Sequence, residues 1–412
     1  MTPPRGALAG ARPPRRALSR ARRAGFEAEP VRRAVRSGAP ARRASTDRRG
    51  VARPIRLAVL ALAASFAGCA LARPEAASPA AEVADGRYAM GTVLEVTLAA
   101  PDAAAGRALL ERLYARTAAL ERELSSHDPA SALSRLNARA GSAPAPVPPA
   151  LAAILRESKA LSRRTGGAFD VTVGPLVALW RAAAARGRPP SQAELAAARA
   201  RVGAERVALE GGAVALAPGT AVELGGVAKG WTLDRLAEDL RAAGVSRALL
   251  SFGQSSVVAL GAPPGGEAWR LLLRDAEGGF AGTIALRDQS LSVSESFGQW
   301  SAIGGRRVGH VLDPRSGLPL AQPRLAAVVA ASGAEAEAWS KALLVLGARE
   351  GLARLATQPG VEALVVDAGG ARAATPGFAR AARFEARPMR PRTARLEARP
   401  MRPRAAGFEG RP

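Results

Sequence analysis

The sequence is poor in several residue types, and each shortage excludes a class of structure or function. Its 412 residues include one cysteine, Cys69, so the chain cannot form an internal disulfide. No segment reads Gly-x-Gly-x-x-Gly at the start of a helix after a strand, and there is no Walker A loop, so the common nucleotide-binding folds have no support. Two histidines and three lysines occur in the whole chain. A histidine or lysine inside a motif therefore carries more weight than usual.

Arginine is abundant, and the positive charge lies in the terminal segments. The formal net charge is +24. Residues 1–56 account for +13 of it and residues 380–412 for +7, which leaves +4 for residues 57–379. That balance is ordinary for a globular domain, so the basicity belongs to the two ends of the chain.

Both ends have compositions that oppose folding. They are rich in Arg, Pro, Ala and Gly and poor in aliphatic residues, so they cannot bury enough apolar surface to offset the entropy of ordering. The C-terminal segment repeats the sequence of 385–392 at 397–404, with too many prolines for a regular helix or central strand. We predict disordered basic tails at 1–52 and 381–412 without a specific nucleic-acid partner, although such tails could bind anionic polymers or lipids non-specifically.

A short apolar segment interrupts the basic N-terminal region. Residues 57–69 follow two arginines and end Phe-Ala-Gly-Cys69, which resembles a bacterial lipobox. About twelve apolar or small residues are too few to span a bilayer but suit a signal peptide. We predict a lipoprotein signal at 53–69, lipidation of Cys69, a flexible tether at 70–85, and a lipid-anchored protein facing the periplasm or cell exterior. A translation start near Val51 would place this signal at the N-terminus.

From Tyr88 onward the pattern is that of a folded domain. Apolar residues alternate with polar ones over 94–98, which predicts a half-buried strand, and leucines at helical spacing predict a helix over 102–124. The other predicted elements are helices at 149–164, from Ser191, from Lys229 to Gly244, at 334–347 and at 348–357, and strands at 206–210, 213–217, 248–252, 269–274, 281–287, 325–331 and 362–367. Helices mixed with runs of strands predict an α+β fold, a single mixed α/β domain over 86–380.

Four segments combine glycine with polar residues that bind nucleotides or move protons. They read Met-Gly-Thr at 90–92, Gly-Ala-Phe-Asp-Val-Thr-Val-Gly-Pro-Leu at 167–176, Glu-Leu-Gly-Gly-Val-Ala-Lys-Gly at 223–230, and Gly-His-Val-Leu-Asp-Pro-Arg-Ser-Gly at 309–317. The glycine pair before Lys229 leaves backbone N–H groups free to meet an anion, and the lysine adds a charge suited to phosphate. A glycine-rich turn before a surface helix is the alternative.

His310 is the candidate general base. An imidazole with an ordinary pKa of about 6.5 can take a proton from a hydroxyl near neutrality. Asp313 could orient this ring or contact a nucleotide. The alternative is a histidine whose hydrogen bonds are satisfied locally, at the turn before Pro314.

Together the four segments, in this order, resemble the ApbE-type flavin transferase family over about residues 86–380. The resemblance implies an enzyme that transfers FMN from FAD to a Ser or Thr hydroxyl of an acceptor protein, with release of AMP. The residues it implies for FAD binding are Met90, Ala168, Phe169, Asp170, Glu223, Lys229 and Val311. It implies His310 and Asp313 as catalytic residues, and a Mg²⁺ site formed by Gly226, Glu337 and the position of Lys341.

That metal site departs from the family pattern. A late helix that usually reads Ala-Asp-Ala-Leu-Ser-Thr, with the Asp and Thr near Mg²⁺ and the FAD pyrophosphate, reads Ala-Glu-Ala-Trp-Ser-Lys at 336–341. Glu337 offers another hard oxygen ligand, but the Lys341 ammonium donates and cannot coordinate a cation. Two interpretations follow: an ion pair on the helix surface, or an ammonium that neutralises the pyrophosphate itself.

Further departures occur at 252–256 and 295–297, and they bear on metal dependence and catalysis more than on flavin binding. Two other functions therefore compete with the transferase. One is a non-catalytic FAD-binding lipoprotein, and the other is an FAD pyrophosphatase. Release of AMP that requires an acceptor protein separates the transferase from both.

Overall fold

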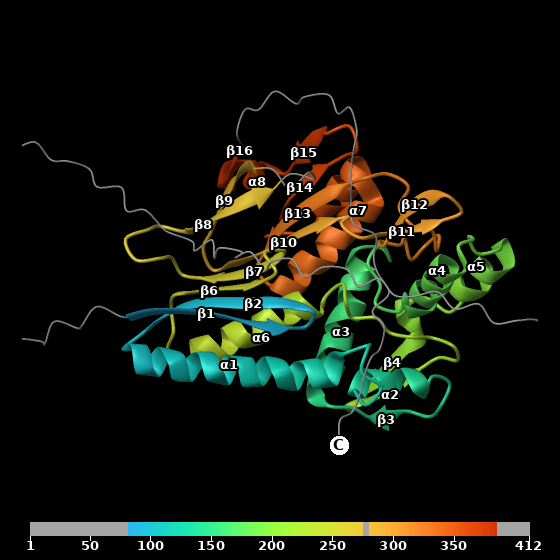
Figure 1. Cartoon of the computed structure of the whole chain (residues 1–412), viewed down its shortest axis with the longest axis horizontal. Helices are drawn as coiled ribbons and strands as arrows, with labels where there is room; N and C mark the ends of the chain where they lie inside the picture. Colours follow the sequence, from blue (N-terminus) through green and yellow to red (C-terminus); the bar gives the residue numbers. More distant parts are fainter. Residues whose placement is uncertain (1–80, 275–279, 385–412) are drawn as a thin grey trace, which may run out of the picture. The chain divides into compact units, whose positions relative to one another are not determined.

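The computed structural model describes residues 81–274 and 280–384, which are built around an eight-stranded antiparallel sheet (Figure 1). The strands run in the order β1-β2-β6-β7-β10-β13-β14-β15 across the sheet. Their bounds are β1 Ala81–Ala89, β2 Thr92–Ala100, β6 Ala248–Phe252, β7 Ser256–Leu260, β10 Gln289–Glu295, β13 Leu325–Ala330, β14 Glu362–Val366 and β15 Arg372–Ala374. Every neighbouring pair is antiparallel, so the predicted α+β class is confirmed.

The central strands of this sheet are buried on both faces. Strand β13 shows this, because Ala326, Val328 and Ala330 belong to the core on the helical face while alternate residues belong to a core on the other face. The helices that cover the first face are α1 (Ala103–Leu124), α3 (Pro149–Arg164), α6 (Ala228–Ala242) and α7 (Gly333–Leu355). A second sheet of β8 (Trp269–Arg274), β9 (Phe280–Leu286) and β16 (Ala382–Phe384), with α8 (Pro376–Ala381), covers the other.

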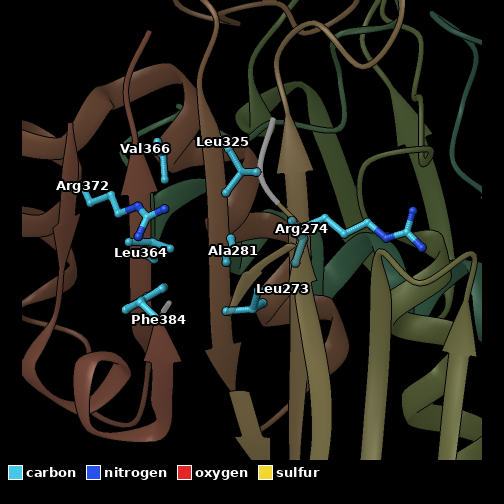
Figure 2. Close-up of a pocket in the computed structure, with 10 residues that line it drawn as sticks. Leu273, Arg274, Ala281, Leu325, Leu364, Val366, Arg372 and Phe384 are labelled. Carbon is cyan, nitrogen blue, oxygen red and sulfur yellow. The ribbon is translucent and has the colours of Figure 1, made fainter. Parts of the chain in front are cut away.

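A pocket lies between the two sheets (Figure 2). Its lining is mostly apolar, with Leu273, Leu325, Leu364 and other side chains from both sheets. The Arg372 guanidinium lies 5.3 Å from the ring centroid of Phe384, while Arg274 points away from the other lining residues. None of the residues predicted to bind FAD lines this pocket. Several of them, including Phe169 and Met90, instead pack in the core of the helical face.

The remaining described elements are short. They are α2 (Ala132–Ala138), α4 (Gly174–Arg186), α5 (Gln192–Arg199), the 3-10 turn η1 (Ala204–Arg206), a small sheet of β3 (Ala145–Pro146), β5 (Ala213–Leu216) and β4 (Val207–Glu210), and the hairpin β11 (Trp300–Ile303) and β12 (Arg306–Gly309). Within the described ranges, every helix is too short or too polar to cross a lipid bilayer.

The first turns of α6 and α7 touch each other through glycine. A Cβ atom on Gly230 would lie 2.2 Å from the backbone oxygen of Gly333, and one on Gly333 would lie 2.6 Å from the oxygen of Gly230. Asp234, one turn further along α6, accepts hydrogen bonds from the N–H groups of Gly333 (2.6 Å) and Ala334 (3.0 Å). The carboxylate thus satisfies two of the free donors at the start of α7. Burial raises the pKa of Asp234 to about 7, and the two N–H bonds oppose that rise.

Several local predictions are confirmed. The Ser191–Glu194 capping box opens α5, and Gly211-Gly212 closes the β4–β5 hairpin. The two helices expected around 347 and 348 appear as one element, α7, broken at Gly347, where φ is 76° and ψ is 179°. Helix α3 ends where the glycines at 166 and 167 adopt positive φ.

The domain is longer at both ends than the sequence predicts. Strand β1 begins at Ala81, inside the predicted tether 70–85, because Ala81 pairs with Ala100 at the far end of β2. At the other end, β16 pairs with β9 through Phe384, so the predicted tail at 381–412 starts too early. The predicted extension at 1–52, the signal at 53–69 with Cys69, and the rest of both predicted tails lie outside the described residues.

Replacement of Gly230 with alanine should destabilise the protein, because the new methyl group meets backbone that cannot move aside without shifting α7. We expect the free energy of unfolding to fall by about 1–3 kcal/mol, measured by chemical denaturation. Gly369→Ala is the matched control, since its Cβ would meet nothing within 4 Å and its φ is not positive. That control should stay within about 0.5 kcal/mol of wild type. Equal losses in both variants would contradict the glycine crossing.

Candidate functional site

Met90 lies in the tight turn between β1 and β2. Its φ of 48° is in the left-handed region, which is unusual for a residue other than glycine. The half-buried side chain packs against both cores of the helical face. The turn therefore holds Met90 where the two cores meet, close to the other predicted site residues.

The segment after α3 is fixed by hydrogen bonds of its own. Asp170 is buried, and its carboxylate accepts from the Ser162 hydroxyl (3.0 Å), the Thr172 N–H (2.8 Å) and the Thr172 hydroxyl (2.6 Å). Ala168 and Phe169 are buried as well. The Asp170 oxygens hold the loop in place, and the predicted contact of Asp170 with FAD stays a prediction.

Glu223 connects this loop to the start of α6. Its backbone N–H donates to the Val171 carbonyl (2.7 Å), and its Oε1 accepts from the Gly225 N–H (3.1 Å) and the Ser126 hydroxyl (3.2 Å). Gly226 comes next and borders Phe169, since a Cβ on it would lie 3.7 Å from the phenyl ring. Two of the predicted motifs are therefore in direct contact.

Lys229 follows in the first turn of α6. Its ammonium donates to the Ser255 hydroxyl at 3.3 Å. Ser255 lies in the β6–β7 turn, where Gly253 and Gln254 both have positive φ. The side chain is half-buried and is the first of two lysines at this site.

Glu337 and Lys341 lie one turn apart on α7. Glu337 is fully buried, and its Oε1 accepts a hydrogen bond from the Ser256 hydroxyl. The Lys341 ammonium is 3.9 Å from the same oxygen, while 24% of the lysine side chain stays exposed. Glu337 Oε2 has no hydrogen-bond partner among the described residues. Ser255 contacts Lys229 and the adjacent Ser256 contacts Glu337, so the two charged side chains are held by neighbouring residues of one turn.

His310 follows the β11–β12 hairpin. Its Nδ1 is 3.1 Å from the carbonyl oxygen of Gln299, and its backbone N–H donates to the same oxygen at 3.2 Å. A carbonyl only accepts, so this contact places the ring proton on Nδ1 and leaves the Nε2 lone pair free. Desolvation lowers the pKa of His310, the bond to Gln299 raises it, and the nearby Lys341 charge lowers it. The neutral, proton-accepting ring therefore persists below the usual pH.

Asp313 does not serve the histidine ring. Its carboxylate accepts from the Arg315 guanidinium at 3.0 and 3.1 Å and from the Arg315 N–H at 2.9 Å, and Arg315 also contacts Glu350. The Asp313 carbonyl closes the turn to Gly317 (2.7 Å). Asp313 was predicted to orient His310 or contact the nucleotide. In the structure Gln299 holds the His310 ring, and the Asp313 carboxylate pairs with Arg315. A contact of Asp313 with the nucleotide stays a prediction, and Val311 is half-buried against the core.

Lys341 interacts electrostatically with Lys229, Glu337 and His310, and we call these four residues the cationic cluster. The Lys341 pKa is lowered by burial and by the charge of Lys229, and the carboxylate of Glu337 opposes this. The His310 pKa also responds to Lys341. The cluster offers two ammonium groups, one free imidazole nitrogen and a single carboxylate. Such a set suits an anion whose reaction includes a proton transfer.

The residues of the implied metal site do not fit a divalent cation. Mg²⁺ prefers near-octahedral oxygen coordination, with carboxylates as its usual protein ligands. Within the described residues, no three His, Cys, Asp or Glu side chains come together as a metal site. Glu337 is the only carboxylate in the cluster, and the ammonium 3.9 Å from it would repel the metal. Gly226 could contribute only backbone atoms.

The structure adds three residues that sequence reasoning did not assign to the site. Ser255 contacts Lys229, Ser256 contacts Glu337, and the Gln299 carbonyl holds His310. The two serines lie in a segment, 252–256, that stood out for its departure from the family pattern. No sequence signal marks Gln299, because its role depends on the backbone carbonyl.

Comparison with known proteins identifies one family over most of the described chain. The model of the ApbE family matches residues 90–365 of the chain. The FAD:protein FMN transferase of Klebsiella pneumoniae (strain 342) is 33% identical over 305 residues, which cover 71% of this chain and 86% of the relative. The protein of that name from Salmonella typhimurium is 33% identical over 320 residues, covering 72% and 90%.

Solved structures give the same result. The apo crystal structure of the Pseudomonas stutzeri flavinyl transferase ApbE superposes with a TM-score of 0.66 at 26% identity, covering 74% of this chain and 97% of that one. The flavin transferase ApbE from Vibrio cholerae gives a TM-score of 0.64 at 26% identity, covering 73% and 99%.

NMR can test the state of His310 directly, because the chain has only two histidines. In a pH titration of the ¹⁵N-labelled imidazoles, we expect His310 to titrate below pH 6.5 and to stay an Nδ1–H tautomer when neutral. Removal of the neighbouring positive charge in Lys341→Met should move its titration upward. His127→Gln assigns the signals. A His310 that titrates at or above 6.5, or that does not respond to Lys341→Met, would contradict this electrostatic picture.

Proposed function

The chain belongs to the ApbE family, and on that premise we propose that it is an FAD:protein FMN transferase that uses the cationic cluster as its active site. FAD is the substrate that supplies the FMN group. The observation that carries the proposal is the fixed His310 ring, with its free Nε2 in the same electrostatic neighbourhood as two lysines. An anion and a hydroxyl can therefore meet at one place.

The proposed reaction needs few parts. The acceptor is a Ser or Thr hydroxyl of another protein, and its oxygen attacks the phosphorus of the FMN half of FAD. A new O–P bond forms, the bond to the bridging oxygen breaks, and AMP leaves with that oxygen. Nε2 of His310 takes the hydroxyl proton as the bond forms. Lys229 and Lys341 balance the charge that develops on the phosphate oxygens.

The other site residues position these groups. Glu223 and Asp170 hold the two loops around Phe169 and Gly226, and the Met90 turn packs against the same cores. Their contribution is to orient FAD and to exclude water, which favours transfer over hydrolysis. No step is assigned to Mg²⁺, because the side chains present do not fit it.

Acceptor-dependent release of AMP is the test of this function. With FAD and a candidate acceptor protein, wild type should release AMP and attach FMN covalently, as mass spectrometry of the acceptor would record. His310→Gln should lower the transfer rate by about 10²–10⁴ while the FAD dissociation constant changes little, since the histidine acts on the proton rather than on binding. Equal AMP release without an acceptor would identify a pyrophosphatase, and FAD binding without AMP release a binding protein.

We also propose that the protein is anchored to the outer face of the bacterial cell membrane through lipidated Cys69. Support comes from the sequence alone, in which a basic flank, a short apolar segment and Phe-Ala-Gly-Cys occur in order. Because Cys69 is the only cysteine in the sequence, it is the only residue to which a lipid could be attached through a thiol.

Metabolic labelling with a fatty-acid probe tests the anchor. Wild type should incorporate the label and fractionate with membranes, whereas Cys69→Ser should be unlabelled and either soluble or unprocessed. Ser65→Ala, a substitution inside the same apolar segment, is the control and should behave as wild type. Unchanged labelling and membrane partitioning of Cys69→Ser would rule out the anchor.

A further inference from the structure

Lys341 lies at a largely buried position beside the fully buried Glu337, which is an unfavourable place for an ammonium group. Burial lowers the pKa of Lys341, because the ammonium loses hydration. The Glu337 carboxylate opposes this shift without cancelling it. The single carboxylate beside it, Glu337, lies 3.9 Å away, which is beyond hydrogen-bond distance. Glu337 Oε1 already accepts from Ser256. The ion pair by itself therefore leaves most of the donor capacity of Lys341 unused.

The second lysine makes the arrangement less favourable without a ligand. Lys229 reaches the cluster from α6 and Lys341 from α7, and the charge of Lys229 lowers the pKa of Lys341. The chain has only three lysines, so this pairing is not a by-product of a lysine-rich surface. The Lys341 side chain keeps 24% of its surface exposed, whereas Glu337 beside it is fully buried. Two ammonium groups there match an anion with two charged centres.

We infer that Lys341, together with Lys229, binds the diphosphate of FAD and takes the place of a divalent cation, so that this chain binds FAD without Mg²⁺. The inference rests on the proposed function, which makes FAD the ligand. It follows from the disagreement between the metal expected for this site and the side chains that occupy it. An ammonium carries half the charge of Mg²⁺ and donates hydrogen bonds to phosphate oxygens directly.

The competing account is structural, in which Lys341 only neutralises the buried Glu337. The two accounts differ in what a double substitution does. The double variant Glu337→Gln, Lys341→Met removes both charges together. If the pair is purely structural, the double variant should keep most of its stability and its affinity for FAD. If Lys341 binds the diphosphate, the double variant folds but its affinity for FAD falls.

The experiment is a fluorescence titration of FAD into each purified protein, with EDTA or with millimolar Mg²⁺. Wild type should have the same dissociation constant in both conditions, within about threefold. Lys341→Met, alone and in the double variant, should weaken binding by at least about tenfold, because a charge-assisted contact is lost. Lys341→Thr should also weaken binding in EDTA but recover with Mg²⁺, since a hydroxyl oxygen can coordinate the metal.

Lys159→Met is the matched control. Lys159 is the one lysine outside the cluster and donates to the Val207 carbonyl from α3. The Lys159→Met variant should bind FAD as wild type does, with or without metal. Thermal unfolding of every variant shows which proteins are folded. Inorganic pyrophosphate, added as a competitor, should bind more weakly to the same variants that bind FAD more weakly.

Binding of Mn²⁺ alone, followed by electron paramagnetic resonance, gives a readout that does not depend on FAD. Wild type should bind Mn²⁺ weakly, and Lys341→Thr more tightly. Three results would overturn the inference while leaving the transferase intact: FAD binding by wild type that weakens tenfold in EDTA, tight Mn²⁺ binding by wild type, or wild-type FAD affinity in the folded double variant. Failure of wild type to bind FAD under either condition would overturn both the inference and the proposed function.

Discussion

The close approach of α6 and α7 is the constraint on which the site depends. Lys229 lies in the first turn of α6, and α7 carries Glu337 and Lys341 one and two turns after its start. The crossing of the two helices therefore sets the separation of the two lysines. Only glycine fits at Gly230 and Gly333, and Asp234 ties the first N–H groups of α7 to α6. The carboxylate is buried at the contact. The same interaction that completes the start of α7 also fixes the charged side chains of the cationic cluster relative to one another.

The strands behind these helices supply the second half of the site. Strand β10 turns serines toward α7, and Ser292 and Ser294 contact the hydroxyl of Ser340 at 3.0 and 2.8 Å. Strand β7 begins with Ser256, which contacts Glu337. A band of hydroxyl groups therefore lies under α7, inside an otherwise apolar layer. These groups hydrogen-bond Ser340 and one oxygen of Glu337 without adding charge, so the cationic cluster keeps its positive character.

Much of this could be predicted from the sequence, where the signal is local. The Ser191 capping box, the Gly211-Gly212 hairpin and the break of α7 at Gly347 depend on short-range preferences, and they occur at the expected positions. Strands β7 and β10 were not predicted. Ser292 and Ser294 alternate with Leu291 and Val293 along β10, and they face a hydroxyl of α7 rather than solvent. That partner is 46 to 48 residues away, so the buried environment of this strand depends on a distant contact. The partners of Asp313 and His310 likewise depended on how a turn and a hairpin fold back.

The base and the anion-binding groups belong to different parts of the architecture. The two lysines are on helices that pack into the core of the helical face, whereas His310 follows a hairpin, β11–β12, that pairs only with itself in the described structure. A two-stranded hairpin has little stability of its own. The backbone bond from Gly304 to the Gly187 carbonyl (2.9 Å) ties its tip to the end of α4. Local unfolding of this hairpin would withdraw the proposed base while both lysines stay in place, so the proposed flavin transfer and the retention of the nucleotide would be separable properties of the chain.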